Sequence, residues 1–159
     1  MTGVLAIAAA VVALDQFTKF IALNWLAPGV PVDVVDGVFS LTLVMNAGLA
    51  FGMLGGLPAA WRWLVALLSI VALLVLTRVA IRIMDESGGV GRVAVGLIFG
   101  GAVGNLIDRA RFGAVVDFLD FYVRAWHWPA FNVADSAISV GVALLALRLV
   151  THPAPRRAA

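Results

Sequence analysis

The chain has 159 residues, of which 63% are hydrophobic and only 13% charged, with a formal net charge of +2. Soluble domains hold about 45–50% apolar and about 25% charged residues, so this composition excludes an ordinary water-soluble domain and predicts an integral membrane protein. The absence of cysteine excludes disulfides and thiol catalysis. The histidines lack the ligand spacing of a zinc site, and the scattered basic residues form no nucleic-acid surface, so we expect neither metal, other cofactor nor nucleic acid.

The first predicted element is a membrane-spanning helix over residues 4–26, which matches the roughly 20 apolar residues that a bilayer requires. It lacks the basic start of a cleavable signal peptide, so we expect it to be retained. Asp15 and Lys19 lie within it, four residues apart, where they can form a helical ion pair. This pair either serves the function or mainly lowers its own cost of burial and orients its neighbours.

The next segment, residues 32–55, is predicted to form a small antiparallel β-sheet on the outer membrane surface. Asp36 and Gly37 give a hairpin turn signal between β-branched residues. Apolar and polar residues then alternate from Phe39 to Leu43, as they do in a half-exposed strand.

Two further spans are predicted at residues 61–84 and 91–107. Gly96, Gly100 and Gly104 recur every four residues in the second of them. This spacing places a glycine stripe on one face, and we expect a neighbouring helix to approach closely there.

The third span ends in three polar residues, Asn105, Asp108 and Arg109, that share one helical face by their spacing. Together they could bind a peptide backbone or brace one another, and Arg109 could also anchor the helix at the membrane boundary. Spacing alone favours structural support for this group.

The outer interfacial segment, residues 108–132, contains Asp117 among apolar neighbours and is predicted to include a short amphipathic helix at Val115–Val123. The fourth span, residues 133–150, begins near Asp135. Arginines flank the connection between the second and third spans and follow the fourth, which places both regions and both termini in the cytoplasm. We therefore expect a single membrane domain, residues 1–159, with four helices and an outer sheet.

Asp117 and Asp135 form the candidate catalytic pair, because the predicted topology brings both to the outer face. Two carboxylates in a poorly hydrated site share one proton. The charged one can then act as general base on water, while the other donates to the carbonyl oxygen and later to the leaving amine. The residues leave open a solvated loop acid for Asp117, a helix N-cap for Asp135, and Asp120 as a competing acid.

Five sequence blocks, in order along essentially the whole chain, resemble the lipoprotein signal peptidases, or signal peptidase II, a family of bacterial aspartic membrane endopeptidases. Each block alone is weakly specific, whereas five in the family's order are highly specific. The blocks are Asp15–Lys19, Asn46–Phe51, Gly100–Arg109, Gly113–Phe118 and Phe131–Ser136.

The resemblance implies removal of the signal peptide from a diacylglyceryl-modified prolipoprotein, cut on the N-terminal side of the lipid-modified cysteine, with Asp117 and Asp135 as the catalytic pair. It also implies that the outer sheet cradles the substrate and that a mobile segment beside Asp117 closes over it. Asp108 matches the family and is interpreted as structural. The positions implied to line, brace or support the substrate site are Asp15, Lys19, Asn46, Gly48, Gly101, Asn105, Arg109, Asn132 and Ala134.

These features predict a monomeric protein of the bacterial cytoplasmic (inner) membrane, surrounded by membrane lipids, with its site near the outer face. One alternative is a small transporter or proton pathway, but such proteins place their charges near the midplane, often with inverted repeats. The other is a non-catalytic scaffold that assembles partners through its glycine face. The scaffold predicts that replacing Asp117 or Asp135 is tolerated, whereas the enzyme predicts loss of activity.

Overall fold

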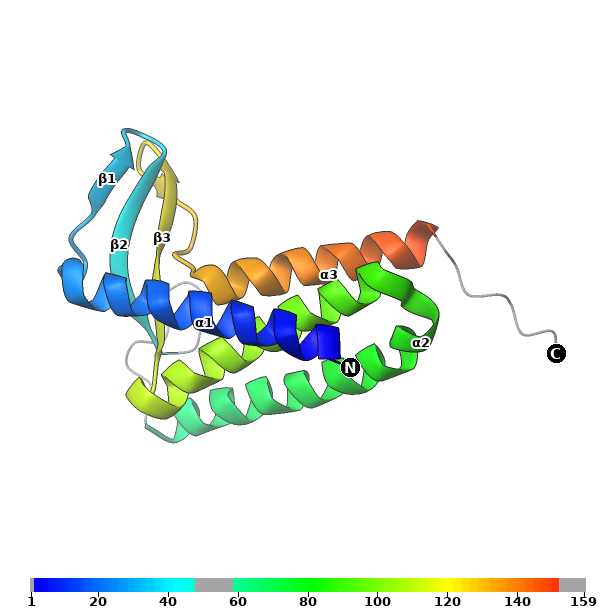
Figure 1. The fold of residues 1–159 in the computed structure, drawn as a ribbon. Helices are drawn as coiled ribbons and strands as arrows, with labels where there is room; N and C mark the ends of the chain where they lie inside the picture. Colours follow the sequence, from blue (N-terminus) through cyan, green and yellow to red (C-terminus); the bar gives the residue numbers. More distant parts are fainter. Residues whose placement is uncertain (1, 48–58, 152–159) are drawn as a thin grey trace.

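The computed structural model describes residues 2–47 and 59–151, with only the backbone described over much of residues 59–88. Figure 1 shows helices packed side by side, with an antiparallel sheet standing at one end of the bundle. The helices are α1 (Thr2–Trp25), α2 (Ala59–Phe112) and α3 (Val133–Thr151). The strands are β1 (Val32–Val35), β2 (Phe39–Asn46), β3 (Val115–Val123) and β4 (Trp126–His127).

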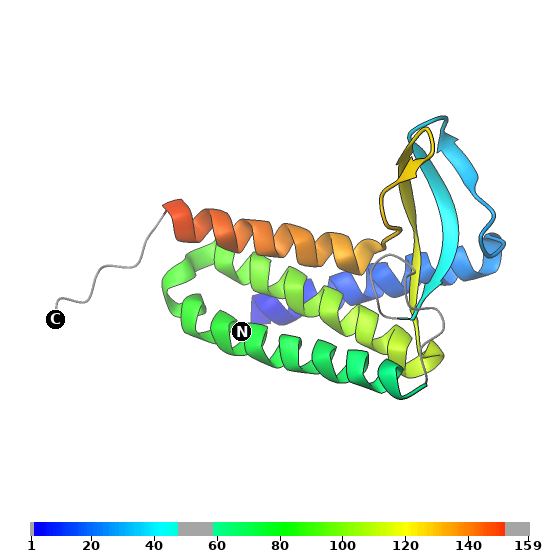
Figure 2. The ribbon, with the colours of Figure 1, turned by 180° about the vertical axis from the view of Figure 1, so that it is seen from behind.

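Helix α2 is helical along its whole length but reverses direction near its middle, so that its two arms run antiparallel (Figures 1 and 2). The predicted spans at residues 61–84 and 91–107 fall on these two arms, whereas the connection between them is also helical. Of the described residues, Thr2–Trp25 and Gly89–Phe112 are helical segments long and apolar enough to cross a membrane. The presence of four spans stays a prediction.

The glycine stripe of α2 packs against α1, which confirms the expected close approach. A Cβ atom on Gly96 would lie 2.7 Å from the Ile7 side chain, and one on Gly100 would lie 2.7 Å from the Ala8 carbonyl oxygen. These separations are far below van der Waals contact. Any side chain larger than that of glycine would therefore force α1 and α2 apart at these positions.

The sheet has the order β1-β2-β3-β4, with antiparallel pairing between neighbours. The strands β1 and β2 confirm the predicted hairpin, and Gly37 in its turn has a φ of 77°. That left-handed conformation is readily available only to glycine. The remainder of the predicted outer β segment, from residue 48 to 55, lies outside the described residues.

The predicted amphipathic helix at Val115–Val123 is wrong, because this segment is strand β3. Its β-branched and aromatic residues favour a pleated strand. Pairing with β2 also satisfies its backbone hydrogen-bonding groups through a ladder. A bulge in β2 between Leu41 and Val44 interrupts this ladder, and Val44 lies opposite Asp117.

A small apolar core joins the sheet to the helices. Ala22 of α1 packs with Leu43 of β2 and with Val116 and Phe118 of β3, all of them buried. This core holds β3, the strand that carries Asp117, against the end of the bundle. The short connection from α2 to β3 in the chain keeps the strand at the same place.

Candidate active site

Polar and charged side chains are buried where the sheet meets the bundle. Burial of such groups in an otherwise apolar protein is costly unless each one is bonded. Every buried side-chain nitrogen and oxygen in the described part of the chain has a hydrogen-bond partner. The buried polar residues are Asp15, Lys19, Ser40, Asn105, Asp108, Asp117, Asp120 and Asn132.

Asp117 and Asp135 come from different elements, and Asn132 binds them both. Asp117 lies on β3, and the Nδ2 atom of Asn132 donates to its Oδ1 at 2.7 Å. Asp135 lies in the first turn of α3, and its Oδ2 accepts from the backbone nitrogen of Asn132 at 3.3 Å. One asparagine therefore links the two carboxylates that the sequence singles out.

Asn132 and Asp135 also form the N-terminal cap of α3. The backbone nitrogen of Asp135 donates to Oδ1 of Asn132 at 2.9 Å, while the Asp135 carboxylate receives the bond from the Asn132 backbone. This reciprocal pattern is a capping box. The N-cap is thus Asn132, and Asp135 occupies the third position of the helix, which corrects the N-cap alternative for Asp135.

Asp117 is 1% exposed, which contradicts the alternative of a solvated loop acid. Burial, together with the charge of Asp135, raises the pKa of its carboxyl to about 7. The bonds from Asn46 and Asn132 and the charge of Lys19 act in the opposite direction. Asn46 donates to Oδ2 of Asp117 at 2.9 Å. Near neutral pH, Asp117 therefore exchanges a proton readily.

Asn105 connects the pair to a charged cluster in the bundle. Its Oδ1 accepts from Lys19 at 3.0 Å and from Asn132 at 3.2 Å. Its Nδ2 donates to Oδ1 of Asp135 at 2.8 Å. Because the amide oxygen faces these donors, its amino group is directed at Asp135.

The charged cluster consists of Asp15, Lys19 and Asp108, which join α1 to the end of α2. The Nζ atom of Lys19 lies 2.9 Å from Oδ2 of Asp15 and 2.7 Å from Oδ2 of Asp108. Gln16, which the sequence analysis did not single out, donates to Oδ1 of Asp108 at 2.9 Å and to Oδ2 of Asp15 at 3.2 Å. Its polarity within an apolar span was the signal available in the sequence.

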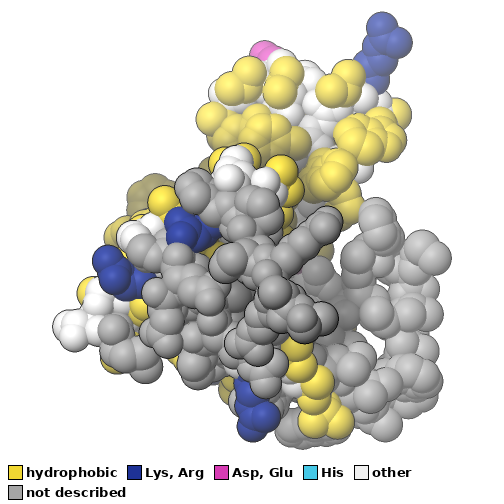
Figure 3. Space-filling model, turned by 90° about the vertical axis from the view of Figure 1, so that its right-hand side faces the viewer, with side chains coloured by type: hydrophobic (Ala, Val, Ile, Leu, Met, Phe, Trp, Pro, Cys, Tyr) yellow, Lys and Arg dark blue, Asp and Glu magenta, His cyan; other side chains and the backbone are white. Residues whose placement is uncertain are grey.

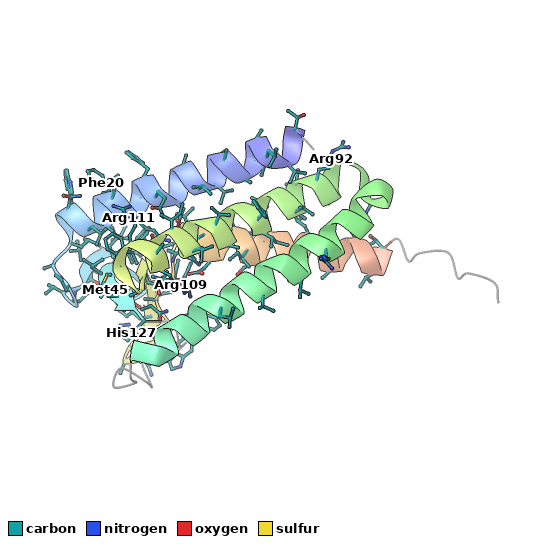
Figure 4. All side chains as sticks on the ribbon, turned by 90° about the horizontal axis from the view of Figure 1, so that it is seen from below. Phe20, Met45, Arg92, Arg109, Arg111 and His127 are labelled. Atoms are coloured by element: carbon teal, nitrogen blue, oxygen red, sulfur yellow. The ribbon has the colours of Figure 1, made fainter. Side chains whose placement is uncertain are left out.

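Arg109 lies at the sheet end of α2, the end at which Figure 4 also places Met45 and His127, whereas Arg92 lies at the opposite end. Its Nη1 donates to the backbone oxygen of Asn105 at 3.3 Å. The guanidinium charge interacts with the carboxylates of Asp135 and Asp117. Arg109 thus places a positive charge near the acidic pair.

Two of the remaining sequence-predicted site residues pack at the start of α3. The backbone nitrogen of Ala134 donates to Oδ1 of Asp15 at 2.9 Å. A Cβ atom on Gly101 would collide with the backbone of Ala134, so glycine is needed for α2 to approach α3 there. Gly48 lies outside the described residues.

Asp120, the competing acid, belongs to a different cluster. It lies three residues beyond Asp117 on β3, and residues an odd number apart on a strand point to opposite faces. Its carboxylate accepts from Thr42 at 3.2 Å and lies 3.0 Å from Nδ1 of His127. Within residues 2–47 and 59–151, no group of three or more His, Asp or Glu side chains is arranged to hold a metal ion.

The arrangement resembles that of known proteins in both sequence and fold. A lipoprotein signal peptidase of Nitratidesulfovibrio vulgaris is 44% identical over 158 residues, which cover 97% of this chain and 93% of that protein. One of Geobacter sulfurreducens is 46% identical over 137 residues, which cover 86% of this chain and 84% of that protein. A solved structure of a bacterial membrane enzyme is similar with a TM-score of 0.77 and 29% identity, covering 96% of this chain and 95% of that one.

The model of the family described as signal peptidase (SPase) II matches residues 7–151, a range that contains every candidate site residue named above. With this match over most of the chain, and with relatives above 40% identity along most of their own length, the chain belongs to the signal peptidase II family of aspartic-type peptidases.

Proposed function

We propose that this protein removes signal peptides from diacylglyceryl-modified prolipoproteins, by cutting on the N-terminal side of the lipid-modified cysteine, with Asp117 and Asp135 as the catalytic pair. The observation that carries this proposal is the bonding of both carboxylates to Asn132. Membership of the family supports the substrate class and does not favour a transporter or a scaffold.

The chemistry follows from a pair that holds one proton between two acids. The ionised carboxylate takes a proton from water as the water oxygen bonds to the scissile carbonyl carbon. The protonated carboxyl donates its proton to the carbonyl oxygen. The carbon–nitrogen bond then breaks as the amine nitrogen accepts a proton from the pair, and one hydroxyl of the tetrahedral intermediate returns its proton to the pair as the carbonyl group forms again. A pKa of about 7 for Asp117 supports proton sharing near neutral pH.

The neighbouring residues have supporting roles in this proposal. Asn46, Asn105 and Asn132 orient the two acids through the bonds described above. Arg109 supplies positive charge to the pair, and with these amides it would contact the peptide backbone of the substrate. Gly48, Gly101 and Ala134 complete the set that lines or braces the site.

The surface of the molecule supports a membrane setting for this reaction. On α1, the exposed large side chains include Phe17, Phe20 and Trp25, which would contact lipid. Figure 3 shows hydrophobic side chains gathered on the sheet above the bundle, and Trp126 and Trp128 are exposed there. Tryptophan favours the membrane–water boundary. The sheet would rest on the outer surface and cradle the substrate, whose acyl chains stay in the bilayer.

We further propose four spans in the bacterial inner membrane, both termini in the cytoplasm, and a monomer surrounded by lipid. The helical arms of α2, together with α1 and α3, supply the four spans. The first turn of α1 and the last turn of α3 lie at the same end of the bundle, opposite the sheet (Figure 1).

The test is cleavage of a diacylglyceryl-modified prolipoprotein by the purified protein in detergent, beside the unlipidated precursor. We expect cleavage of the lipidated form only. Asp117→Asn and Asp135→Asn should each abolish cleavage while the fold is retained, because either change ends the shared-proton chemistry. Normal turnover by either folded variant would remove that residue from the catalytic pair. Failure of a folded wild type to cut the lipidated substrate would refute the proposed function.

A further inference from the structure

The charged cluster behind the acidic pair bonds to the backbone beside each of the two acids. Oδ1 of Asp15 accepts from the backbone nitrogen of Ala134, the residue immediately before Asp135, at 2.9 Å. Oδ2 of Asp108 accepts from the backbone nitrogen of Val116, the residue immediately before Asp117, at 3.1 Å. Two buried carboxylates therefore bind equivalent positions on the two segments.

A single cation joins these two carboxylates. Lys19 is 2% exposed, and its Nζ lies within 3 Å of both Asp15 and Asp108. An ammonium group held between two acids fixes their distance from each other, since moving either one leaves a buried charge unpaired. The bond from Gln16 to each acid adds a second link between them.

We propose that Asp108 and Asp15 are positioning residues that set the separation between Asp117 and Asp135 through the amides of Val116 and Ala134, with Lys19 as their common cation. This inference rests on the proposed function, because the distance between the two acids affects the rate only if Asp117 and Asp135 are the catalytic pair. It assigns Asp108, which the sequence analysis interpreted as structural, a role in the reaction rate. The side-chain partners of Asp108 are Lys19, Gln16 and the Val116 amide, so its effect on the acids is indirect.

The separation of two coupled acids is visible in the pH dependence of turnover. Two carboxylates that share a proton show two apparent pKa values, and the gap between these values grows as their interaction strengthens. Releasing the Val116 amide lets Asp117 move relative to Asp135, which weakens their interaction. We therefore expect the gap between the two apparent pKa values to narrow. A misplacement of about 1 Å can lower the rate roughly 100-fold.

The experiment measures the pH profile of kcat, the KM for a lipidated prolipoprotein, and the thermal unfolding midpoint of the purified full chain in detergent. The variant is Asp108→Leu, which has a similar shape but removes both the charge toward Lys19 and the oxygen that accepts from the Val116 amide. The matched control is Asp120→Leu, the same change at a buried acid of β3, whose partners are His127 and Thr42 rather than the charged cluster.

We expect Asp108→Leu to lower kcat by roughly 100-fold, to leave KM within about twofold, since the substrate contacts are retained, and to narrow the gap between the two apparent pKa values. Asp120→Leu should keep the wild-type gap between these values. A folded Asp108→Leu with wild-type kcat and an unchanged profile would overturn the proposal. A lower kcat that only follows a smaller folded fraction, with an unchanged profile, would overturn it as well.

The double variant Lys19→Met with Asp108→Leu covers the case in which the single variant does not fold. It removes one positive and one negative charge together, so the net charge of the cluster stays at its wild-type value. A folded double variant with slow turnover and a narrowed gap supports positioning, whereas one with wild-type turnover refutes it. Cleavage by wild type and its loss in Asp117→Asn, measured in the same series, test the proposed function separately.

Discussion

At the scale of single residues, the site depends on amide side chains whose two ends differ. Asn105 and Asn132 each present an oxygen in one direction and a nitrogen in the other, so each binds a donor and a carboxylate at once. An aspartate in either place would add a charge, and an alanine would leave buried carboxylates with fewer donors. The asparagines therefore hold both acids without neutralising them.

The contact between Asn46 and Asp117 makes the pH dependence of activity testable. A hydrogen bond to the charged form of an acid lowers its pKa, so Asn46→Ala should raise the pKa of Asp117 above its present value of about 7. The alkaline limb of the pH–rate profile should move to higher pH by about one to two units, since bonds to charged groups contribute about 1.5–3 kcal/mol.

The control for this prediction is Asn24→Ala, because Asn24 is an exposed residue of α1 whose side chain binds the backbone of Phe20. Its profile should match the wild type. If the alkaline limb of Asn46→Ala stays in place or moves to lower pH, the bond to Asp117 does not govern its titration.

The raised pKa of Asp117 also determines how its contribution to the free energy of unfolding changes with pH. Between about pH 4 and pH 7 the folded protein holds a proton that the unfolded chain releases. The contribution is fully present below the unfolded pKa and is lost as the pH rises through 7. Asp117 therefore favours the folded state more at the acidic end of this window.

At the scale of elements, the close approach of α1 and α2 depends on glycine. Gly100→Ala would place a Cβ atom 2.7 Å from both the Ala8 carbonyl oxygen and the Val11 side chain. Overpacking of this kind typically costs about 1–3 kcal/mol. We expect a lower thermal unfolding midpoint and, because α1 carries Asp15 and Lys19, a lower rate of cleavage.

Gly89→Ala is the matched control, since nothing lies within 4 Å of a Cβ atom at that helical position. Alanine has a higher helix propensity than glycine, so this variant should be as stable as the wild type or more so. Equal unfolding midpoints for Gly100→Ala and the wild type would contradict this prediction, because they would show that α1 and α2 accommodate the extra methyl group with no loss of stability.

The elements also show what a single sequence can and cannot reveal. Hydropathy located α1 and α3 because a long apolar run has few other interpretations. Strand β3 was misassigned because its nine residues are compatible with either a helix or a strand, and its partner β2 lies about 70 residues earlier. Its conformation is decided by pairing across the sheet.

The site was predictable in its residue types and not in its connections. Acids within or beside apolar spans are expensive, which singled out Asp15, Asp117 and Asp135. The bonds from Asp15 and Asp108 to backbone amides leave no trace in the sequence, because any residue except proline supplies such an amide. Gln16 was missed for a related reason, since its partner Asp108 lies 92 positions away.

At the scale of the whole molecule, the two ends of the helical bundle carry different parts of the chain. The sheet and the buried polar site occupy one end, while the start of α1 and the end of α3 lie at the other (Figure 2). A reporter fused to either terminus should therefore face the same compartment. We expect the cytoplasm, as measured by a fluorescent protein that matures there and an alkaline phosphatase that works only outside.

A control fusion inserted in the turn at residues 36–37 should give the reverse pattern, because this turn belongs to the sheet. Termini that report opposite compartments would contradict the proposed four spans, since an even number of crossings returns the chain to its starting side. Such a result would leave the geometry of the acidic pair unaffected.

The bond between Asp15 and Ala134 has a consequence for the order of synthesis. It spans 119 positions of the chain, from the first helix to the last, and Asp135 follows at the next residue. A nascent chain that has inserted α1, α2 and the sheet still lacks one acid, its linking asparagine and the amide that Asp15 binds. On the proposed function and topology, we expect proteolytic activity to arise only when the final helix has been made and inserted, so that an unfinished chain is inactive.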